Sequence, residues 1–450
     1  FRNNVYGADG NLLCDTTGGI NGTSYKINGI VLSDVSRNLF TNNVNALSYI
    51  VNGTVLSDVS RNLFTSNINA SGDVNIGFNA NSYKIASYNV LSTSSSNVLL
   101  GVCNPSNSFM YGTNNTFGGQ DSGYTYHHSG YSTDSNAGFG KNSLYNNTNG
   151  SYNTATGCGS LNANTSGSYN TAVGFQSGSG TLSTGNFNSF FGIYSGYSIG
   201  STATENTAIG CYSLYSCSSA MHNTAVGHRS LFSHSSPNYC TAIGNESQYQ
   251  STSPVYETTS VGYQSLYQNT SNSTVAIGAG SLFSNTNGVE NTAIGYHTLY
   301  NNSTGFHNTA CGYFSLYSST TSCGASNGTG YYNAFYGNLS GTNATTGHAN
   351  CAFGYYSLSG YVTGNGNSAF GVSSLLNLTS GIGNTAVGSG TSPNASSANY
   401  QTSIGASANS SDTSGQYCTC IGYQSSTPNI VAATALGSFS ACASNYQLSL

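Results

Sequence analysis

The sequence predicts an all-β, fibrous protein that consists mainly of a parallel β-solenoid, or β-roll, with about 17 residues per coil. The main observation is a repeat, Asn-Thr-Ala-(Val/Ile)-Gly-x-x-Ser-Leu-(Tyr/Phe), that recurs from about residue 136 onward. Its glycines, here called the anchors, follow one another at nearly constant steps, apart from one longer step between Gly312 and Gly337. The composition agrees, because 57 Gly, 35 Tyr and abundant Asn, Ser and Thr suit short strands and tight turns.

The period excludes other repeat architectures. Helical-pair repeats need more than about 30 residues and leucine-rich repeats about 20 or more. One solenoid coil of two or three short strands fits, and coils stacked about 4.8 Å apart would form a rod roughly 80 Å long. Asn/Gly/Ser-rich composition is also typical of disordered segments. Disorder gives no reason for a fixed register, so the repeat argues against it.

The chain divides into three predicted parts. Residues 1–70 carry a different repeat, since the sequence at 27–41 returns almost unchanged at 51–65. Asn28-Gly29 and Asn52-Gly53 lie between apolar runs there and predict hairpin turns. We expect this part to be a cap or joint. Residues 71–135 predict an irregular β connecting region, and residues 136–450 predict the solenoid.

Two positions of the repeat predict structural ladders. An Asn stands four residues before most anchors, and stacked Asn side chains can hydrogen-bond from coil to coil. The anchor glycine is expected to take a backbone conformation that a Cβ would forbid. The ladder residues are Asn153, Asn170, Asn206, Asn223, Asn291 and Asn308, with Gly157, Gly174, Gly210, Gly227, Gly295 and Gly312.

Apolar positions predict the core. One residue before the anchor is Val or Ile, for example Val173 and Ile209, and we call these residues the aliphatic column. Four residues after the anchor is Leu, for example Leu161 and Leu231, which form the leucine column. These two columns are the predicted core. The Ala two residues before the anchor indicates a tight approach, such as one to a neighbouring subunit.

Aromatic residues recur five residues after the anchor and form the aromatic column. One interpretation is a stack of rings that stabilises the rod. The other is a surface for sugar rings, with Tyr215, Tyr267, Tyr300 and Tyr317 as the candidate glycan contacts.

The charge content excludes several function classes. The chain has 7 Lys+Arg and 12 Asp+Glu, a net charge of -5, and no apolar run long enough to cross a membrane. We therefore expect no nucleic-acid partner and no membrane insertion. Walker-type phosphate-binding loops and His-Glu-x-x-His zinc motifs are absent from the sequence, which predicts no enzyme and no catalytic, cofactor-binding or metal site.

Two alternative functions stay open. Glu205, Glu257 and Glu290 all stand five residues before an anchor. Glu257 and Glu290 are two coils, about 10 Å, apart, loosely near the carboxylate separation of inverting glycosidases. A tailspike-like polysaccharide-degrading enzyme is therefore one alternative. The other is an ice-binding solenoid, suggested by a Thr three residues before many anchors, which we call the threonine column.

Cysteines and glycosylation signals add little. The spacing of the 12 Cys does not suit a disulfide framework; Cys311 takes an aliphatic-column position, and most are interpreted as small buried apolar residues. Sequons such as those at Asn146, Asn164, Asn269, Asn301 and Asn377 permit a glycoprotein without requiring one.

The Asn-Thr-Ala-Val-Gly-x-x-Ser-Leu repeats resemble those of trimeric autotransporter adhesin heads, which are left-handed parallel β-rolls. The Asn-Gly-x-Val-Leu-Ser-Asp-Val-Ser-Arg-Asn-Leu units resemble segments of phage and giant-virus tail or surface fibres. The 17-residue coil is longer than the adhesin-head repeat. These resemblances imply a structural fibre or filament of a virion or cell surface, extracellular, with an adhesion role. The expected partners are further copies, as a homotrimer or filament, and cell-surface glycans.

Overall fold

The computed structural model describes residues 112–124 and 133–450, apart from 181, 252 and 318–329, together with seven short strands before residue 104. The chain divides into two compact units, Phe1–Asn79 and Ala80–Leu450.

The first unit contains two antiparallel strand pairs among its described residues. β1 (Val5–Tyr6) pairs with β2 (Leu12–Cys14), and β3 (Tyr49–Val51) pairs with β4 (Thr54–Ser57). β3 and β4 lie on either side of Asn52-Gly53 and pair antiparallel, which agrees with the hairpin predicted there, although the two turn residues lie outside the described residues. The other predicted turn, Asn28-Gly29, lies outside the described residues.

The second unit begins with three antiparallel strands, β5 (Ser82–Ile85), β6 (Tyr88–Ser94) and β7 (Asn97–Cys103). β7 then pairs in parallel with β8 (Thr116–Gly118), and β8 pairs in parallel with β9 (Ala137–Phe139). The parallel stack therefore begins before residue 136, the start that the repeat predicts.

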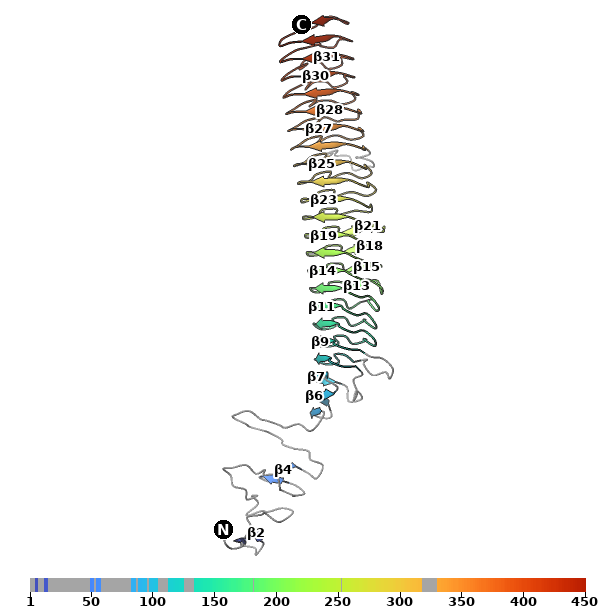
Figure 1. Cartoon of the computed structure of the whole chain (residues 1–450), viewed down its shortest axis with the longest axis vertical. Coiled ribbons are helices and arrows are strands. Elements are labelled where there is room, and N and C mark those ends of the chain that lie inside the picture. Colours follow the sequence, from blue (N-terminus) through green and yellow to red (C-terminus); the bar gives the residue numbers. More distant parts are fainter. Residues whose placement is uncertain are drawn as a thin grey trace. The chain divides into compact units, whose positions relative to one another are not determined.

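From β9 onward, each coil adds one strand of the same sheet, and the whole forms a β-solenoid of about 19 turns (Figure 1). This confirms the predicted fold class. Each strand pairs in parallel and in register with its neighbours in the order given. The strands are β10 (Thr154–Thr156), β11 (Thr171–Val173), β12 (Ser189–Phe191), β14 (Thr207–Ile209), β16 (Thr224–Val226), β19 (Thr241–Ile243), β22 (Thr259–Val261), β23 (Val275–Ile277), β24 (Thr292–Ile294), β25 (Thr309–Cys311), β26 (Ala334–Tyr336), β27 (Cys351–Phe353), β28 (Ser368–Phe370), β29 (Thr385–Val387), β30 (Thr402–Ile404), β31 (Thr419–Ile421), β32 (Thr434–Leu436) and β33 (Leu448–Ser449).

The central coils carry additional short strands. β13 (Ser198–Ile199), β15 (Ser216–Cys217), β17 (Ser233–His234) and β20 (Gln250–Ser251) form a second parallel sheet. β18 (Pro237–Asn238) pairs with β21 (Val255–Tyr256). Coils in this region therefore have more than one hydrogen-bonded side.

The anchor glycines stack directly on one another. Gly157 and Gly174 have φ angles of 132° and 137°, a region that residues with a Cβ rarely adopt. A Cβ on Gly157 would lie within 2.6 Å of the carbonyl carbon of Gly174. No side chain fits there, and this is the conformation that the sequence predicts for the anchors.

Left-handed backbone also occurs at bulky residues, which the sequence did not predict. Leu161, Leu214 and Leu231 of the leucine column have φ angles of 48–49°. A left-handed conformation costs about 1–2 kcal/mol per residue. Full burial of a Leu side chain contributes about 1.5–3 kcal/mol. Each of these three side chains is completely buried, so burial offsets the backbone cost.

The core differs from the prediction at one of its two columns. The leucine column is buried, but the aliphatic column is not: Ile209 is 43% and Ile243 39% exposed. We call the sheet that runs through all coils the ladder sheet; each of its strands from β8 to β32 has three residues, and side chains alternate between its two faces. The central Ala, such as Ala208, therefore points into the coil, while the residues on either side of it point out.

The prediction of an aliphatic core column was therefore wrong, as was that of a neighbouring subunit at the Ala. Ala172 and Ala208 are completely buried within one chain. These alanines form the alanine column, and they meet the leucine column inside each coil.

Replacing an anchor glycine should destabilise the stack. In Gly210→Ala the new Cβ would lie 2.6 Å from the carbonyl oxygen of Gly227, so we expect a clear fall in melting temperature, measured by circular dichroism. Gly366→Ala is the control, because nothing lies within 4 Å of its Cβ. Its φ is 67°, and Ala349 occupies the same repeat position at 54°. A smaller fall in Gly210→Ala than in Gly366→Ala would contradict the anchor role.

The inward and outward columns should also differ in their response to charge. Leu231→Asp buries an unpaired carboxylate and should lower the free energy of unfolding by more than about 4 kcal/mol. Ile243→Asp places the same group on an exposed position and should cost far less. Denaturant unfolding of the two variants measures the difference, and equal losses would show that the core assignment is wrong.

Candidate binding surfaces

Every surface of the solenoid is a set of columns, because each repeat position lies above its equivalent in the next coil. The interior holds two columns of hydrogen-bonded amides. The exterior holds the threonine, aliphatic and aromatic columns, together with charged residues in a few coils.

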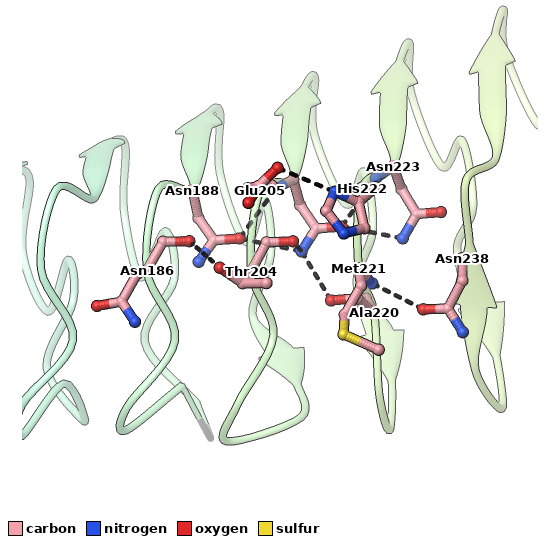
Figure 2. Close-up of polar contacts among 10 residues, drawn as sticks. Asn186, Asn188, Thr204, Glu205, Ala220, Met221, His222, Asn223 and Asn238 are labelled. Atoms are coloured by element: carbon pink, nitrogen blue, oxygen red, sulfur yellow. Dashed lines mark hydrogen bonds and ion pairs between the residues drawn. The ribbon is translucent and has the colours of Figure 1, made fainter.

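The asparagine column hydrogen-bonds each coil to the next (Figure 2). The backbone N–H of Asn223 donates to Oδ1 of Asn206 at 3.1 Å, and Nδ2 of Asn223 donates to the same atom at 2.9 Å. Nδ2 of Asn206 also donates to the carbonyl oxygen of Ala220, one coil further on, at 2.8 Å. Asn153 and Asn170, and likewise Asn291 and Asn308, are joined by the same backbone-to-Oδ1 bond.

A second buried amide column was not predicted. It stands seven residues after the anchor and includes Asn147, Asn164, Asn269, Asn285 and Asn302. Nδ2 of Asn302 donates to Oδ1 of Asn285 at 3.0 Å and to the carbonyl of Gly305 at 2.9 Å. The spacing of these residues is visible in the sequence, but neighbouring coils replace them with Ile199, Cys217 and His234. Two sequon residues, Asn164 and Asn269, are buried and therefore inaccessible to a glycosyltransferase.

The outer face of the ladder sheet carries the threonine column and the aliphatic column side by side. The aliphatic column is apolar in every described coil from Val173 to Leu436, and most of its members are more than a third exposed. Further exposed rings stand just after many anchors, including Phe175, Tyr263 and Tyr313. Cys311 belongs to this outer face, not to the core, for the reason given for Ile209.

The aromatic column is a continuous stack of half-buried rings. From Tyr197 to Tyr300 the ring centroids of successive coils are 4.8–5.4 Å apart, with interplanar angles of 10° or less. Tyr317 continues the stack at 5.4 Å, tilted by 32°. The predicted glycan contacts Tyr215, Tyr267, Tyr300 and Tyr317 are all in this stack. Their ring faces are covered by neighbouring rings, so ring edges and hydroxyls are the parts left for contacts with other molecules.

Two Glu–His pairs occupy the corner column, which stands five residues before the anchor. Oε2 of Glu205 lies 2.9 Å from Nδ1 of His222 (Figure 2). Oε2 of Glu290 lies 2.8 Å from Nδ1 of His307. Each imidazole stacks on the ring of the next coil, His222 on Tyr239 at 4.7 Å and His307 on Tyr332 at 5.0 Å.

The acids of the enzyme alternative are thus engaged with other side chains. Glu205 and Glu290 pair with histidines, and Oε2 of Glu257 accepts a hydrogen bond from Ser273 at 3.3 Å. Within the part of the chain that the structure describes, no three His, Cys, Asp or Glu side chains form a group that could hold a metal ion.

A charged row borders the aromatic column two residues after the anchor. Nη1 of Arg229 lies 3.6 Å from Oε1 of Glu246, and Nε2 of Gln264 donates to Oε2 of Glu246 at 2.8 Å. The guanidinium carbon of Arg229 lies 5.7 Å from the ring centroid of Phe232, a cation–π contact. Arg229, Glu246 and Gln264 belong to successive coils, so the row runs parallel to the stack of rings.

These features concentrate in the central coils, residues 192–317. This region contains both Glu–His pairs, the charged row, the second sheet and the stack of rings from Tyr197 to Tyr317. From residue 112 onward, the Lys, Arg, Asp and Glu residues outside the central coils are Asp121, Asp134, Lys141 and Asp412. The central coils are therefore the candidate binding region of the rod.

Burial keeps the side chains of Cys217 and His234 uncharged at pH 7. Burial raises the pKa of the Cys217 thiol to about 12, so the thiol stays protonated and is a poor nucleophile. Among the described cysteines, Cys217, Cys240, Cys418, Cys420 and Cys442 are buried, whereas Cys158 is exposed. Burial lowers the pKa of His234 from 6.5 to about 4, so its imidazole, bound to the carbonyl of Gln248, is neutral at pH 7.

The sequence matches no family model, and no curated protein shows significant similarity to it. None of the described residues forms a helix with the length and apolar character that a membrane crossing needs.

The buried His234 should make the solenoid sensitive to acid. Its pKa is lower in the folded state than the 6.5 of the unfolded chain, so the unfolded chain takes up a proton first. Stability is complete above pH 6.5 and is lost as the pH falls toward 4, by about 3 kcal/mol at pH 4.

His234→Asn should remove this part of the acid dependence, because Asn fills the same column in other coils, as Asn269 and Asn285 do. Urea unfolding between pH 7 and 4 measures it. His222→Asn, at a partly exposed position, is the control and should leave the dependence in place. An unchanged pH profile in His234→Asn would contradict the assignment.

Proposed function

We propose that the protein is a non-catalytic structural fibre whose rods associate side by side through the outer face of the ladder sheet. The observation that supports this proposal is the aliphatic column. It presents an apolar side chain in every described coil from Val173 to Leu436. Contiguous exposed apolar surface of this length is uncommon on a soluble monomer and is typical of interaction surfaces.

A second copy of the chain is the partner that fits this face best. The face repeats mostly apolar side chains at the coil spacing, and another copy of the chain repeats them at the same spacing and so matches it over its full length. The net charge of -5 over 450 residues gives little repulsion between copies. Burial of one Ile or Val contributes about 1.5–3 kcal/mol at most, so many weak contacts along the rod would add up.

The proposed location and oligomeric state rest on the resemblances to known families, not on the apolar character of the outer face. Adhesin heads and virus fibres favour an extracellular site on a virion or cell surface, three chains per fibre and an adhesion role. A filament of single chains is the other arrangement. In both cases the first 70 residues are proposed as the cap or joint.

The proposal of a non-enzyme draws support from the engagement of the acids. Glu205, Glu257 and Glu290 each contact a neighbouring side chain, and they lie along an exposed corner of the rod. Glycosidases instead place two carboxylates on either side of one bound sugar.

An ice-binding solenoid is the second candidate, supported by the position of the threonine column. Thr154, Thr171 and Thr207 point outward beside the aliphatic column on the same sheet face. A face covered by another copy would be closed to ice. Inhibition of ice recrystallisation by a monomeric sample would favour this candidate over the fibre.

Charges placed in the aliphatic column should dissociate the rods. The variant combines Ile209→Lys, Ile243→Lys and Ile277→Lys, which places a cation on the outer face in alternate coils. Between two associated rods each cation would be desolvated and would repel the cations of the other copy. We expect sedimentation velocity at micromolar concentration to report a multimer for the natural chain and a monomer for the variant.

The control is Gln250→Lys with Gln268→Lys, which adds charge to exposed positions away from the outer face. It should leave the multimer intact. A natural chain that sediments as a monomer under these conditions would refute the proposal.

A further inference from the structure

We propose that a strip in the central coils binds an extended, uncharged glycan chain that lies along the rod. The strip consists of the charged row, Arg229, Glu246 and Gln264, and the three rings beside it, Phe232, Tyr249 and Tyr267. This inference rests on the adhesion role proposed above and assigns it to a place and a class of ligand.

The rings supply a rigid, regularly spaced floor. Phe232 and Tyr249 are 5.1 Å apart at 2°, and Tyr249 and Tyr267 are 5.0 Å apart at 6°. The coils beneath them are joined by backbone hydrogen bonds, including those from Ser233 to Tyr249 and from Gln250 to Tyr267. Rings held in this way lose little further freedom on binding, which favours affinity.

The charged row supplies donors and acceptors that remain available for hydrogen bonds to a ligand. The Arg229 side chain is 40% exposed, and its Nη1 lies 3.6 Å from Oε1 of Glu246, so the guanidinium is not held in a close ion pair. A guanidinium carries five donors, and a carboxylate accepts at both oxygens. Gln250 and Gln268, both exposed, follow two of the rings in the sequence and add further amide groups.

The neutrality of the strip points to an uncharged ligand. Arg229 and Glu246 cancel each other, so neither an acidic nor a basic polymer gains a net attraction. Neighbouring hydroxyl groups of a sugar chain both donate and accept, which suits adjacent guanidinium, carboxylate, amide and phenol groups. The ring faces are already stacked, so the contacts of Tyr249 and Tyr267 with the sugars come from their hydroxyls and ring edges.

A peptide suits the strip less well. Extended peptides are commonly bound by adding a strand to an open sheet edge. Here the backbone beneath the rings is already paired between coils, since β17 pairs with both β15 and β20. The strip therefore offers side chains at a regular spacing instead of a free strand edge.

Tyr249→Phe combined with Tyr267→Phe and Gln264→Ala removes the hydroxyls and one amide while keeping the stack, because Phe already occupies this column at Phe232 and Phe283. The matched control is Tyr400→Phe with Tyr417→Phe, a stacked pair outside the central coils. Affinity electrophoresis through gels containing hydroxyethylcellulose, galactomannan or dextran measures binding, and heparin serves as the acidic probe.

We expect at least one neutral polysaccharide to retard the natural chain and the control equally. The strip variant should bind at least about tenfold more weakly, because several hydrogen bonds are lost. Absence of retardation in all three neutral gels, equal retardation of the strip variant, or retardation by heparin alone would overturn the proposal.

Sedimentation of the same variants separates this failure from failure of the fibre proposal. The strip variant should remain a multimer, since the outer face is untouched. A strip variant that becomes monomeric would show that copies of the chain, not glycans, cover the strip, and would also overturn the glycan assignment.

Discussion

The close contact between successive anchor glycines is the constraint on which the rest of the solenoid depends. Gly157 and Gly174 approach so closely that no Cβ fits between them, and this fixes each coil directly above the last. Once the coils are in register, Asn206 and Asn223 are within hydrogen-bond distance and the rings from Tyr197 to Tyr300 stack. Stability in such a fold comes from repeated contacts between neighbouring coils, not from one compact core.

The same constraint limits what each coil can contain. The interior is filled by the small Ala of the ladder strand opposite one Leu, with buried amides on either side. Most coils keep this arrangement, but some interior positions vary: Phe190 replaces the Ala, and Ile199, Cys217 and His234 replace an Asn of the second amide column. The outward columns of the central coils add the charges, with Arg229, Glu246 and the Glu–His pairs.

Sequence alone predicts the solenoid and the coil length, because the period appears directly in the spacing of the anchors. It misplaces the core because a three-residue strand is too short to reveal its alternation: Thr207-Ala208-Ile209 gives no sign that the small central residue, and not the larger Ile, points inward. The left-handed Leu231 was also missed, since Leu carries no turn signal. Likewise Arg229 and Glu246 are distant enough in sequence that only the coil stack brings them together beside Phe232.

The central claim is that rods of this protein associate side by side through the outer face of the ladder sheet. Small-angle X-ray scattering over a concentration series tests it most directly, because the cross-sectional radius and the length of a rod are separate quantities in the scattering curve. The account predicts that the cross-section grows with concentration while the length stays constant. A cross-section that remains that of a single coil at every concentration, or growth in length alone, would contradict it.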